Sequence, residues 1–227
     1  MSRVVLGLLV ALMLCRSVEA FGSDGVVLIN QAKVNTSGGF PFKITHSGSY
    51  KLSGNLVVPA NTDAIDLLVD DVTIDLNGFT IQGPIVCDNG TGANCAPAAS
   101  GFPAGISAPA RIGVTVRNGH IRGFVLGVQI LGGLLEEMEF VSNIDGIAAN
   151  DAVIRRTTAR NSGNVGIICA GCVVTESIAR DNFGFGFVLT GGGVFGSSRV
   201  TSSPGHPFVI DPSITSQHNS SCDGGTC

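Results

Sequence analysis

Gly127-Val128-Gln129-Ile130 is the first of five short apolar segments that decide the fold of this chain. The others are Gly146-Ile147-Ala148-Ala149, Gly166-Ile167-Ile168-Cys169, Gly186-Phe187-Val188-Leu189 and Pro207-Phe208-Val209-Ile210, whose first residues follow at intervals of 19, 20, 20 and 21. A second series keeps nearly the same spacing, with intervals of 19, 19, 20 and 21: Val116, Leu135, Ile154, Val174 and Phe195. Two independent markers with one period indicate an internal repeat of about 20 residues.

Each repeat has room for short strands and tight turns only. The apolar blocks are short and are alternating or β-branched, which is typical of strands. Gly, Asn, Asp and Ser, which tolerate tight turns, fill the intervals between them. Short strands that return every 20 residues or so, with no room for a helix, predict an all-β, single-stranded right-handed parallel β-helix (a solenoid) of about seven coils.

Stacking of the coils about 4.8 Å apart should align equivalent residues in columns. The first apolar column would contain Val128, Ile147, Ile167, Phe187 and Phe208, and the second Ile130, Ala149, Cys169, Leu189 and Ile210. Two outward columns alternate in charge: Arg117, Glu136 and Arg155, and then Glu137, Arg156 and Glu176. Opposite charges on neighbouring strands stabilise such a register, which supports the alignment.

Three further stretches carry a family resemblance. Ile44–Leu56 reads ITHSGSYKLSGNL, Val72–Ile81 reads VTIDLNGFTI and Val114–Gly119 reads VTVRNG. They resemble secreted bacterial right-handed parallel β-helix proteins of the pectin-lyase-like superfamily, over about residues 40 to 210. The resemblance implies the fold and little chemistry, because this fold serves lyases, hydrolases, epimerases, adhesins and inert spacers.

The chain ends predict export and capping. Residues 1–20 have the features of a signal peptide: Arg3, the apolar run Val4–Cys15, and small residues at Val18 and Ala20. The mature protein is therefore expected to be secreted or periplasmic. Residues 21–43 are expected to cap the solenoid, 44–210 to form it with an inserted loop at 84–103, and 211–227 to form a C-terminal cap or tail. No linker separates a second domain.

Six cysteines remain after the signal peptide, in three couples that are close in sequence: Cys87 with Cys95, Cys169 with Cys172, and Cys222 with Cys227. Fifteen connectivities are open, and pairing within each couple is the simplest. The Cys169–Cys172 pair could instead be a redox couple or half a zinc site. No second ligand pair stands at zinc spacing, so local structural disulfides are the prediction.

Composition excludes several classes of function. A hydrophobic share of 44% argues against disorder, and a net charge of −4 provides no basic field for nucleic acid. No run after the signal peptide reaches the length of a membrane span. The acidic residues Asp63, Asp66, Asp70, Asp71 and Asp75 suggest Ca²⁺, but their spacing fits neither an EF-hand nor a nonapeptide calcium repeat. We therefore predict no metal and no other cofactor.

The candidate site lies on the outward positions of the first strand of each coil. Arg122, Arg160 and Arg180 should share one column, and His120 and Glu139 should stack next to it. This column could grip a uronate or sulfate polysaccharide, with Arg160 and Arg180 as the substrate-binding residues. The alternative is a solvated surface neutralised by Glu139 and Asp181.

An eliminating lyase or an epimerase would need a base and a cation beside a carboxylate. His120, Arg122 and Glu139 are the candidate catalytic residues, with Arg160 as a further cation. A hydrolase is the weaker hypothesis, because Glu136 and Glu139 should point to opposite faces of one strand. The sequence thus predicts a secreted binding or structural module with an anionic polysaccharide as partner, with the lyase or epimerase as the alternative.

Overall fold

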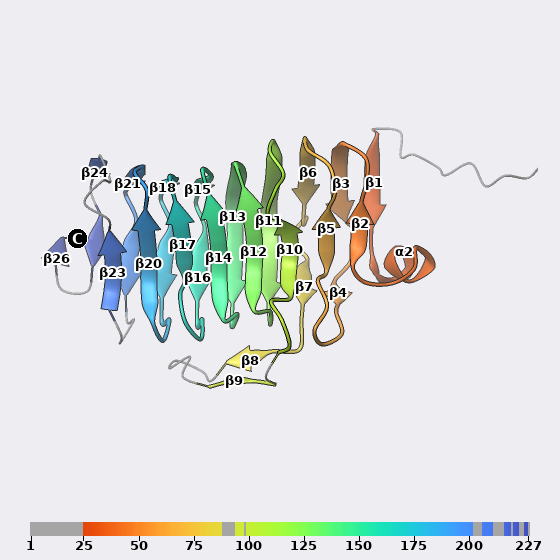
Figure 1. Cartoon of the computed structure of the whole chain (residues 1–227), viewed down its shortest axis with the longest axis horizontal. Helices are drawn as coiled ribbons and strands as arrows, with labels where there is room; N and C mark the ends of the chain where they lie inside the picture. Colours follow the sequence, from red (N-terminus) through yellow and green to blue (C-terminus); the bar gives the residue numbers. More distant parts are fainter. Residues whose placement is uncertain are drawn as a thin grey trace, which may run out of the picture.

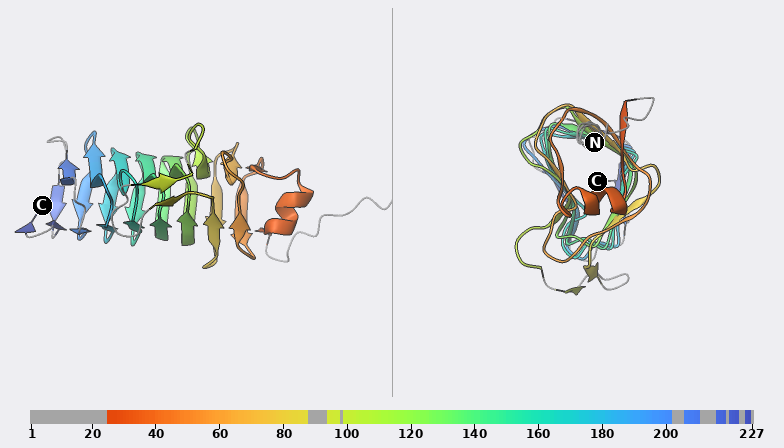
Figure 2. Two further views of the ribbon diagram at one scale, coloured as in Figure 1. Left: turned by 90° about the horizontal axis from the view of Figure 1, so that it is seen from below. Right: turned by 90° about the vertical axis from the view of Figure 1, so that its right-hand side faces the viewer.

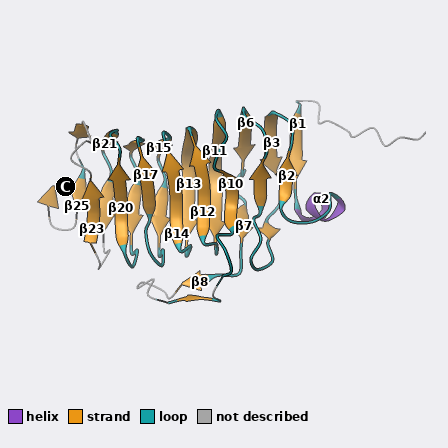
Figure 3. Ribbon diagram, viewed as in Figure 1, coloured by secondary structure: helices purple, strands orange, loops and turns teal. Residues whose placement is uncertain are grey.

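The computed structural model describes residues 25–87, 94–97, 99–201, 206–210, 216–218, 220–222 and 225–226. The expected signal peptide and most of the expected C-terminal tail lie outside the described residues. Figure 1 shows an elongated stack of coils whose strands run across the long axis. Strands dominate the described chain, and Figure 3 shows one short helix at the end of the stack.

One sheet takes a single parallel strand from each coil. Its strands, in spatial order, are β2 (Phe42–Ile44), β5 (Ile65–Leu67), β10 (Ala104–Ala108), β12 (Leu126–Leu131), β14 (Asp145–Asn150), β17 (Ile167–Ala170), β20 (Phe185–Thr190) and β23 (His206–Ile210). The prediction of an all-β parallel β-helix is confirmed. The described coils number about eight, against the expected seven or so.

A 16-stranded sheet forms the rest of the coil wall. Its path runs through β1 (Val26–Ile29), β3 (Gly48–Leu52), β6 (Val72–Asp75), β11 (Val114–Arg122), β13 (Gly133–Val141), β16 (Thr158–Arg160), β19 (Ile178–Arg180), β22 (Arg199–Thr201), β25 (Ser221–Cys222) and β26 (Gly225–Thr226). Beside it pair β4 (Leu56–Val57), β7 (Thr80–Gln82), β15 (Val153–Arg155), β18 (Val173–Thr175), β21 (Val194–Gly196) and β24 (Ser216–His218). All of these pairs are parallel except β25 with β26.

A left-handed residue divides this sheet lengthwise into two strips. Residues with positive φ recur there once per coil: Asn118, Glu137, Arg156, Glu176 and Ser197. In β11 and β13 the strand continues through this residue, whereas in the next coil it ends one strand, β15, and a new one, β16, follows. We call the part after the left-handed residue the second strip. It consists of β7, the second halves of β11 and β13, β16, β19 and β22.

The core is the expected stack of apolar columns. Val128 pairs with Ile147, Ile147 with Ile167, and Ile167 with Phe187, and all four are fully buried. Ile130, Ala149, Cys169 and Leu189 form the second column in the same register. Each coil therefore buries its apolar side chains against those of the coils above and below.

The N-terminal end of the solenoid carries helix α2 (Gln31–Thr36). Asn30 caps this helix through a bond from the Lys33 N–H to its side chain, and the helix buries Val34. Figure 2 shows α2 lying at the end of the coil stack. Within the segment expected as a cap, β1 already pairs with β3, so the solenoid wall begins at Val26.

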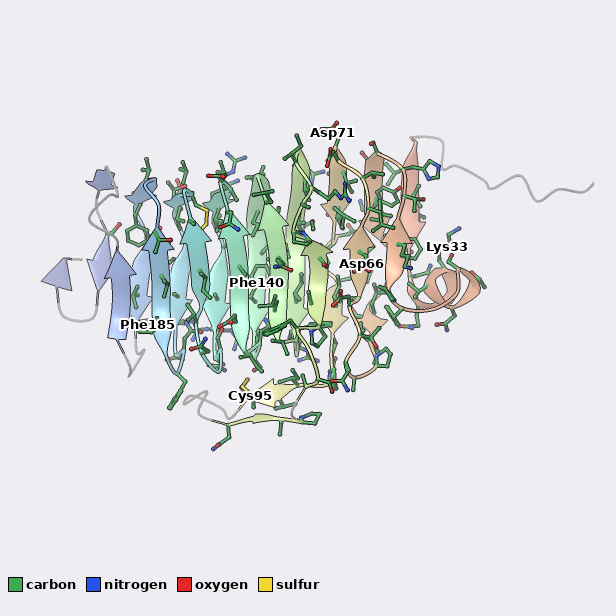
Figure 4. The ribbon with its side chains drawn as sticks, in the orientation of Figure 1. Lys33, Asp66, Asp71, Cys95, Phe140 and Phe185 are labelled. Carbon is green, nitrogen blue, oxygen red and sulfur yellow. A yellow bond between two sulfur atoms is a disulfide. The ribbon has the colours of Figure 1, made fainter. Side chains whose placement is uncertain are left out.

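The inserted loop carries a two-stranded antiparallel hairpin, β8 (Val86–Cys87) and β9 (Cys95–Ala96), which lies beside the stack (Figures 1 and 4). A disulfide joins Cys87 to Cys95, and Cys87 packs with Ile85 and Val125 in a small separate core. A second disulfide joins Cys169 to Cys172. These two predicted pairings are confirmed, and the pairing of Cys222 with Cys227 lies outside the described side chains.

Candidate functional site

The outward columns of the second strip have the predicted register. Arg122 pairs with Val141, Val141 with Arg160, and Arg160 with Arg180 on successive coils. In the neighbouring column His120 pairs with Glu139. Successive side chains of a strand point to opposite faces, so Ile121 between His120 and Arg122 is fully buried.

A groove of about 380 Å³ runs along the arginine column. The second strip and the turn after it contribute Arg122, Val141, Ser142, Arg160 and Asn161 to its lining. Gln82, at the end of β7, lies beside Arg122 on the same strip, and the chain that continues from it into the hairpin, Gly83 through Pro84 and Ile85 to Val86, completes the lining. We call this run, Gly83–Val86, the groove wall. The groove therefore combines the groove wall with residues from three later coils.

Two glycines let the groove wall lie against the solenoid. The Gly83 N–H donates to the Arg122 carbonyl at 2.8 Å, and the Ile85 N–H donates to the Gly123 carbonyl at 3.0 Å. A Cβ atom on Gly83 would collide with the Gly123 backbone, so these two segments can lie this close only because residue 83 is a glycine. Ile85 then buries its side chain and fixes the direction of the wall.

The two groove arginines have different partners. Arg122 donates from Nη2 to Gln82 Oε1 at 2.7 Å, and no carboxylate of the described residues forms an ion pair with it. Arg160 donates from Nε to Glu139 Oε1 at 2.7 Å. Arg122 thus gives the groove an uncompensated positive charge, while the charge of Arg160 is partly neutralised.

Glu139 also contacts His120, with 3.5 Å between Glu139 Oε2 and His120 Nε2. Neither residue lines the groove, although Glu139 holds Arg160, which does. Arg180 lies one coil beyond Arg160 and is not part of the groove lining. It forms an ion pair with Asp181, with 3.1 Å between Arg180 Nη1 and Asp181 Oδ2. Among the five predicted site residues, the structure brings Arg122 and Arg160 together in one groove.

Reasoning from sequence did not predict the groove wall and did not assign Gln82 or Asn161 to the site. Gln82 and Asn161 follow the repeat, beside Arg122 and after Arg160. The path of the groove wall depends on how the inserted loop leaves the solenoid, and no repeat predicts that path. The only signal in the sequence is the interruption of the period at residues 84–103.

The part of the sheet before the left-handed residue, which we call the first strip, carries charged columns that form ion pairs at the surface. Arg117 contacts Asp75 at 3.4 Å, and Glu136 contacts Arg155 at 3.0 Å and Arg156 more closely. The hydrogen bond from Arg155 is the main reason why the pKa of Glu136 is below its usual value. These charges therefore compensate one another.

The acidic stretch contains a carboxyl pair, Asp63 and Asp66. Asp63 Oδ1 accepts the Ala104 N–H at 2.6 Å. Burial, and then a hydrogen bond and charge interaction with Asp63, raise the pKa of Asp66 to about 6, although Lys43 acts in the opposite direction. Asp66, which is labelled in Figure 4, lies on β5 in the eight-stranded sheet and not on the second strip. No group of three or more metal-ligating side chains occurs in the described part of the chain.

No family model and no curated protein matches the chain. Among solved structures, the Agl-KA catalytic domain aligns with 84% of this chain and 43% of its own, at 12% identity and a TM-score of 0.48. A candidate glycosyl hydrolase from Parabacteroides merdae aligns with 91% of this chain and 96% of its own, at 14% identity and a TM-score of 0.39. No functional conclusion follows from likeness at this level.

Within the described residues, no helix has the length and apolar character of a membrane span.

Proposed function

We propose that this protein is an exported β-helix module that binds an anionic polysaccharide in the groove that Arg122 and Arg160 line. The observation that carries the proposal is the groove itself, with two guanidinium groups on one side and the neutral groove wall on the other. Guanidinium groups match carboxylates and sulfates in geometry and charge. Val141 lies between the two arginines and offers an apolar floor for a sugar ring.

Binding is favoured over catalysis by the chemistry of the lining. Among the described residues that line the groove, the only titratable groups are the two arginines. Proton transfer near neutral pH needs a group whose pKa lies near the working pH, and arginine is far above it. The groove is therefore equipped to hold an anion and not to exchange protons with it.

Export and membership of the pectin-lyase-like superfamily are part of this proposal. The N-terminal residues 1–20 have the pattern of a signal peptide, and the two local disulfides are of the kind that persists in oxidising compartments. An envelope or extracellular glycan would then be the available partner.

A lyase or epimerase is the second candidate, and the His120–Glu139 contact favours it. A carboxylate that contacts a histidine can orient it or charge it for proton transfer. Incubation with polygalacturonate or alginate distinguishes the two functions, because an eliminating lyase produces C=C bonds that absorb ultraviolet light. An epimerase would change the sugar composition of the polymer. Neither change is expected from a binding module.

Retention on immobilised polygalacturonate, alginate and dextran sulfate at low salt tests the binding function. The wild type should be retained by at least one of them, and the double variant Arg122→Ala/Arg160→Ala should elute with the unbound fraction. Arg117→Ala/Arg199→Ala is the matched control, since it removes the same charge from the same sheet outside the groove. Equal loss in both double variants would show attraction to net charge only, and an unretained wild type would refute the proposal.

A further inference from the structure

Glu139 connects a histidine outside the groove to an arginine inside it. Its two carboxylate oxygens have different partners: Oε1 accepts from Arg160 Nε at 2.7 Å, and Oε2 lies 3.5 Å from His120 Nε2. The three side chains come from three successive strands, β11, β13 and β16. The contact between Glu139 and His120 lies outside the groove, and anion binding by Arg160 does not require it.

We propose that His120, Glu139 and Arg160 form a proton-controlled switch that makes the groove bind anions more tightly as the pH falls. The inference rests on the proposed binding function and assigns a regulation to the same site. When His120 is neutral, Glu139 has one cationic partner and neutralises Arg160. When His120 is protonated, Glu139 is shared between two cations, and Arg160 presents more of its charge to the groove.

The geometry of Arg160 suits this role. Glu139 accepts a hydrogen bond from the Nε–H of Arg160, and the two terminal nitrogens of Arg160 make no hydrogen bond to a described residue. A bound carboxylate or sulfate can therefore approach these nitrogens while Nε remains on Glu139. Protonation of His120 strengthens the positive charge there without any movement of the backbone.

None of the other described groups that face the switch is a histidine. Across the strands, His120 is flanked by Thr80, and Glu139 is flanked by Thr158. The charged neighbours are Arg117 and Arg122 on β11, Glu136 and Glu137 on β13, and Arg180 on β19 next to Arg160. Histidine is the side chain that ordinarily changes charge between pH 5 and 8.

The experiment measures the affinity of the protein for polygalacturonate at about pH 5.5 and about pH 8, an interval in which uronate carboxyls stay ionised. The wild type should bind about threefold more tightly at the lower pH, the size expected from the loss of one exposed ion pair. His120→Asn should bind like the wild type at the higher pH and change little between the two. His46→Asn, which removes an exposed histidine from the N-terminal end, should keep the wild-type response.

Glu139→Gln distinguishes the switch from a direct attraction between His120 and the polymer. If the effect passes through Glu139, this variant should bind tightly at both pH values. A pH response of wild-type size in Glu139→Gln, or weaker binding at both pH values, would overturn the switch and leave the binding function intact. Failure of the wild type to bind any of the three glycans at either pH would refute the binding function as well.

A measurement without glycan gives a second test. In NMR spectra, the Nε–H signal of Arg160 should shift as the His120 ring titrates, because both contact the same carboxylate. In His120→Asn this shift should be absent. A constant Arg160 signal during a complete His120 titration in the wild type would contradict the proposal.

Discussion

The side chain of Asn143 accepts the backbone N–H of Phe124, one coil earlier, at 3.0 Å. Its amide nitrogen donates to the Ile121 carbonyl at 3.2 Å, and the whole residue is fully buried. Asn182 repeats the arrangement with the Ser162 N–H and the Ala159 carbonyl. A buried asparagine in the turn between two strands of a coil thus satisfies backbone groups that the strands leave without partners.

Asn143→Leu should destabilise the solenoid by about 2–4 kcal/mol, because it leaves one buried N–H and one buried carbonyl without partners. Chemical denaturation measures the free energy of unfolding. Asn150→Ala is the control: Asn150 is exposed and its side chain makes no hydrogen bond in the described structure, so its change should stay within about 0.5 kcal/mol. Equal effects in the two variants would show that the buried bonds contribute nothing.

Ser162→Asn should stabilise the protein by about 1 kcal/mol. Ser162 lies between Asn143 and Asn182 in the stack, is fully buried, and its hydroxyl has no partner. An asparagine there would have the Asn143 N–H to accept, and Gly146 provides the space that Gly166 provides next to Asn182. Thermal unfolding should show a higher Tm for Ser162→Asn than for the wild type, and Ser162→Ala is the control for loss of the hydroxyl. A Tm no higher than that of the wild type would mean that the larger side chain does not fit or gains no hydrogen bond.

The sequence predicts the columns well because a β-helix is periodic. One alignment of the repeats is enough to pair His120 with Glu139, and to line up Arg122, Val141, Arg160 and Arg180. The same alignment cannot predict the groove wall, because the chain leaves the repeat after Gln82. The first coil was missed for a similar reason, since its strands β1 and β2 are separated by helix α2 and do not follow the 20-residue spacing.

Asp66→Asn should make the protein more stable at pH 7.5 and leave it unchanged near pH 4. The pKa of Asp66 in the folded protein is about 6, above the ordinary value for an unfolded chain. The folded state therefore binds the proton more tightly, and this contribution is full below pH 4 and is lost as the pH rises through 6. After screening by solvent, we expect a difference of about 1 kcal/mol. Denaturation at the two pH values measures it, and equal stabilities of wild type and variant at both would contradict the account.

Gly83→Ala should weaken glycan retention without unfolding the solenoid. The added methyl group meets the Gly123 backbone and must push the groove wall away from Arg122. Gly54→Ala is the matched control, because a Cβ there meets only the Asn30 Cβ at 3.8 Å, which is an ordinary contact, and Gly54 does not line the groove. Both variants should keep the β-rich circular dichroism spectrum, and only Gly83→Ala should elute early from the polygalacturonate column. Normal retention of Gly83→Ala would show that the wall is not part of the binding surface.

The most direct test of the anion-binding groove is a crystal structure of the protein with bound tetragalacturonate. The account predicts sugar carboxylates within hydrogen-bond distance of Arg122 and Arg160, and a sugar ring over Val141. An oligosaccharide bound elsewhere, such as in the cavity next to Lys43 and His46 at the N-terminal end, would contradict it. So would an empty groove in crystals grown at a ligand concentration that saturates binding in solution.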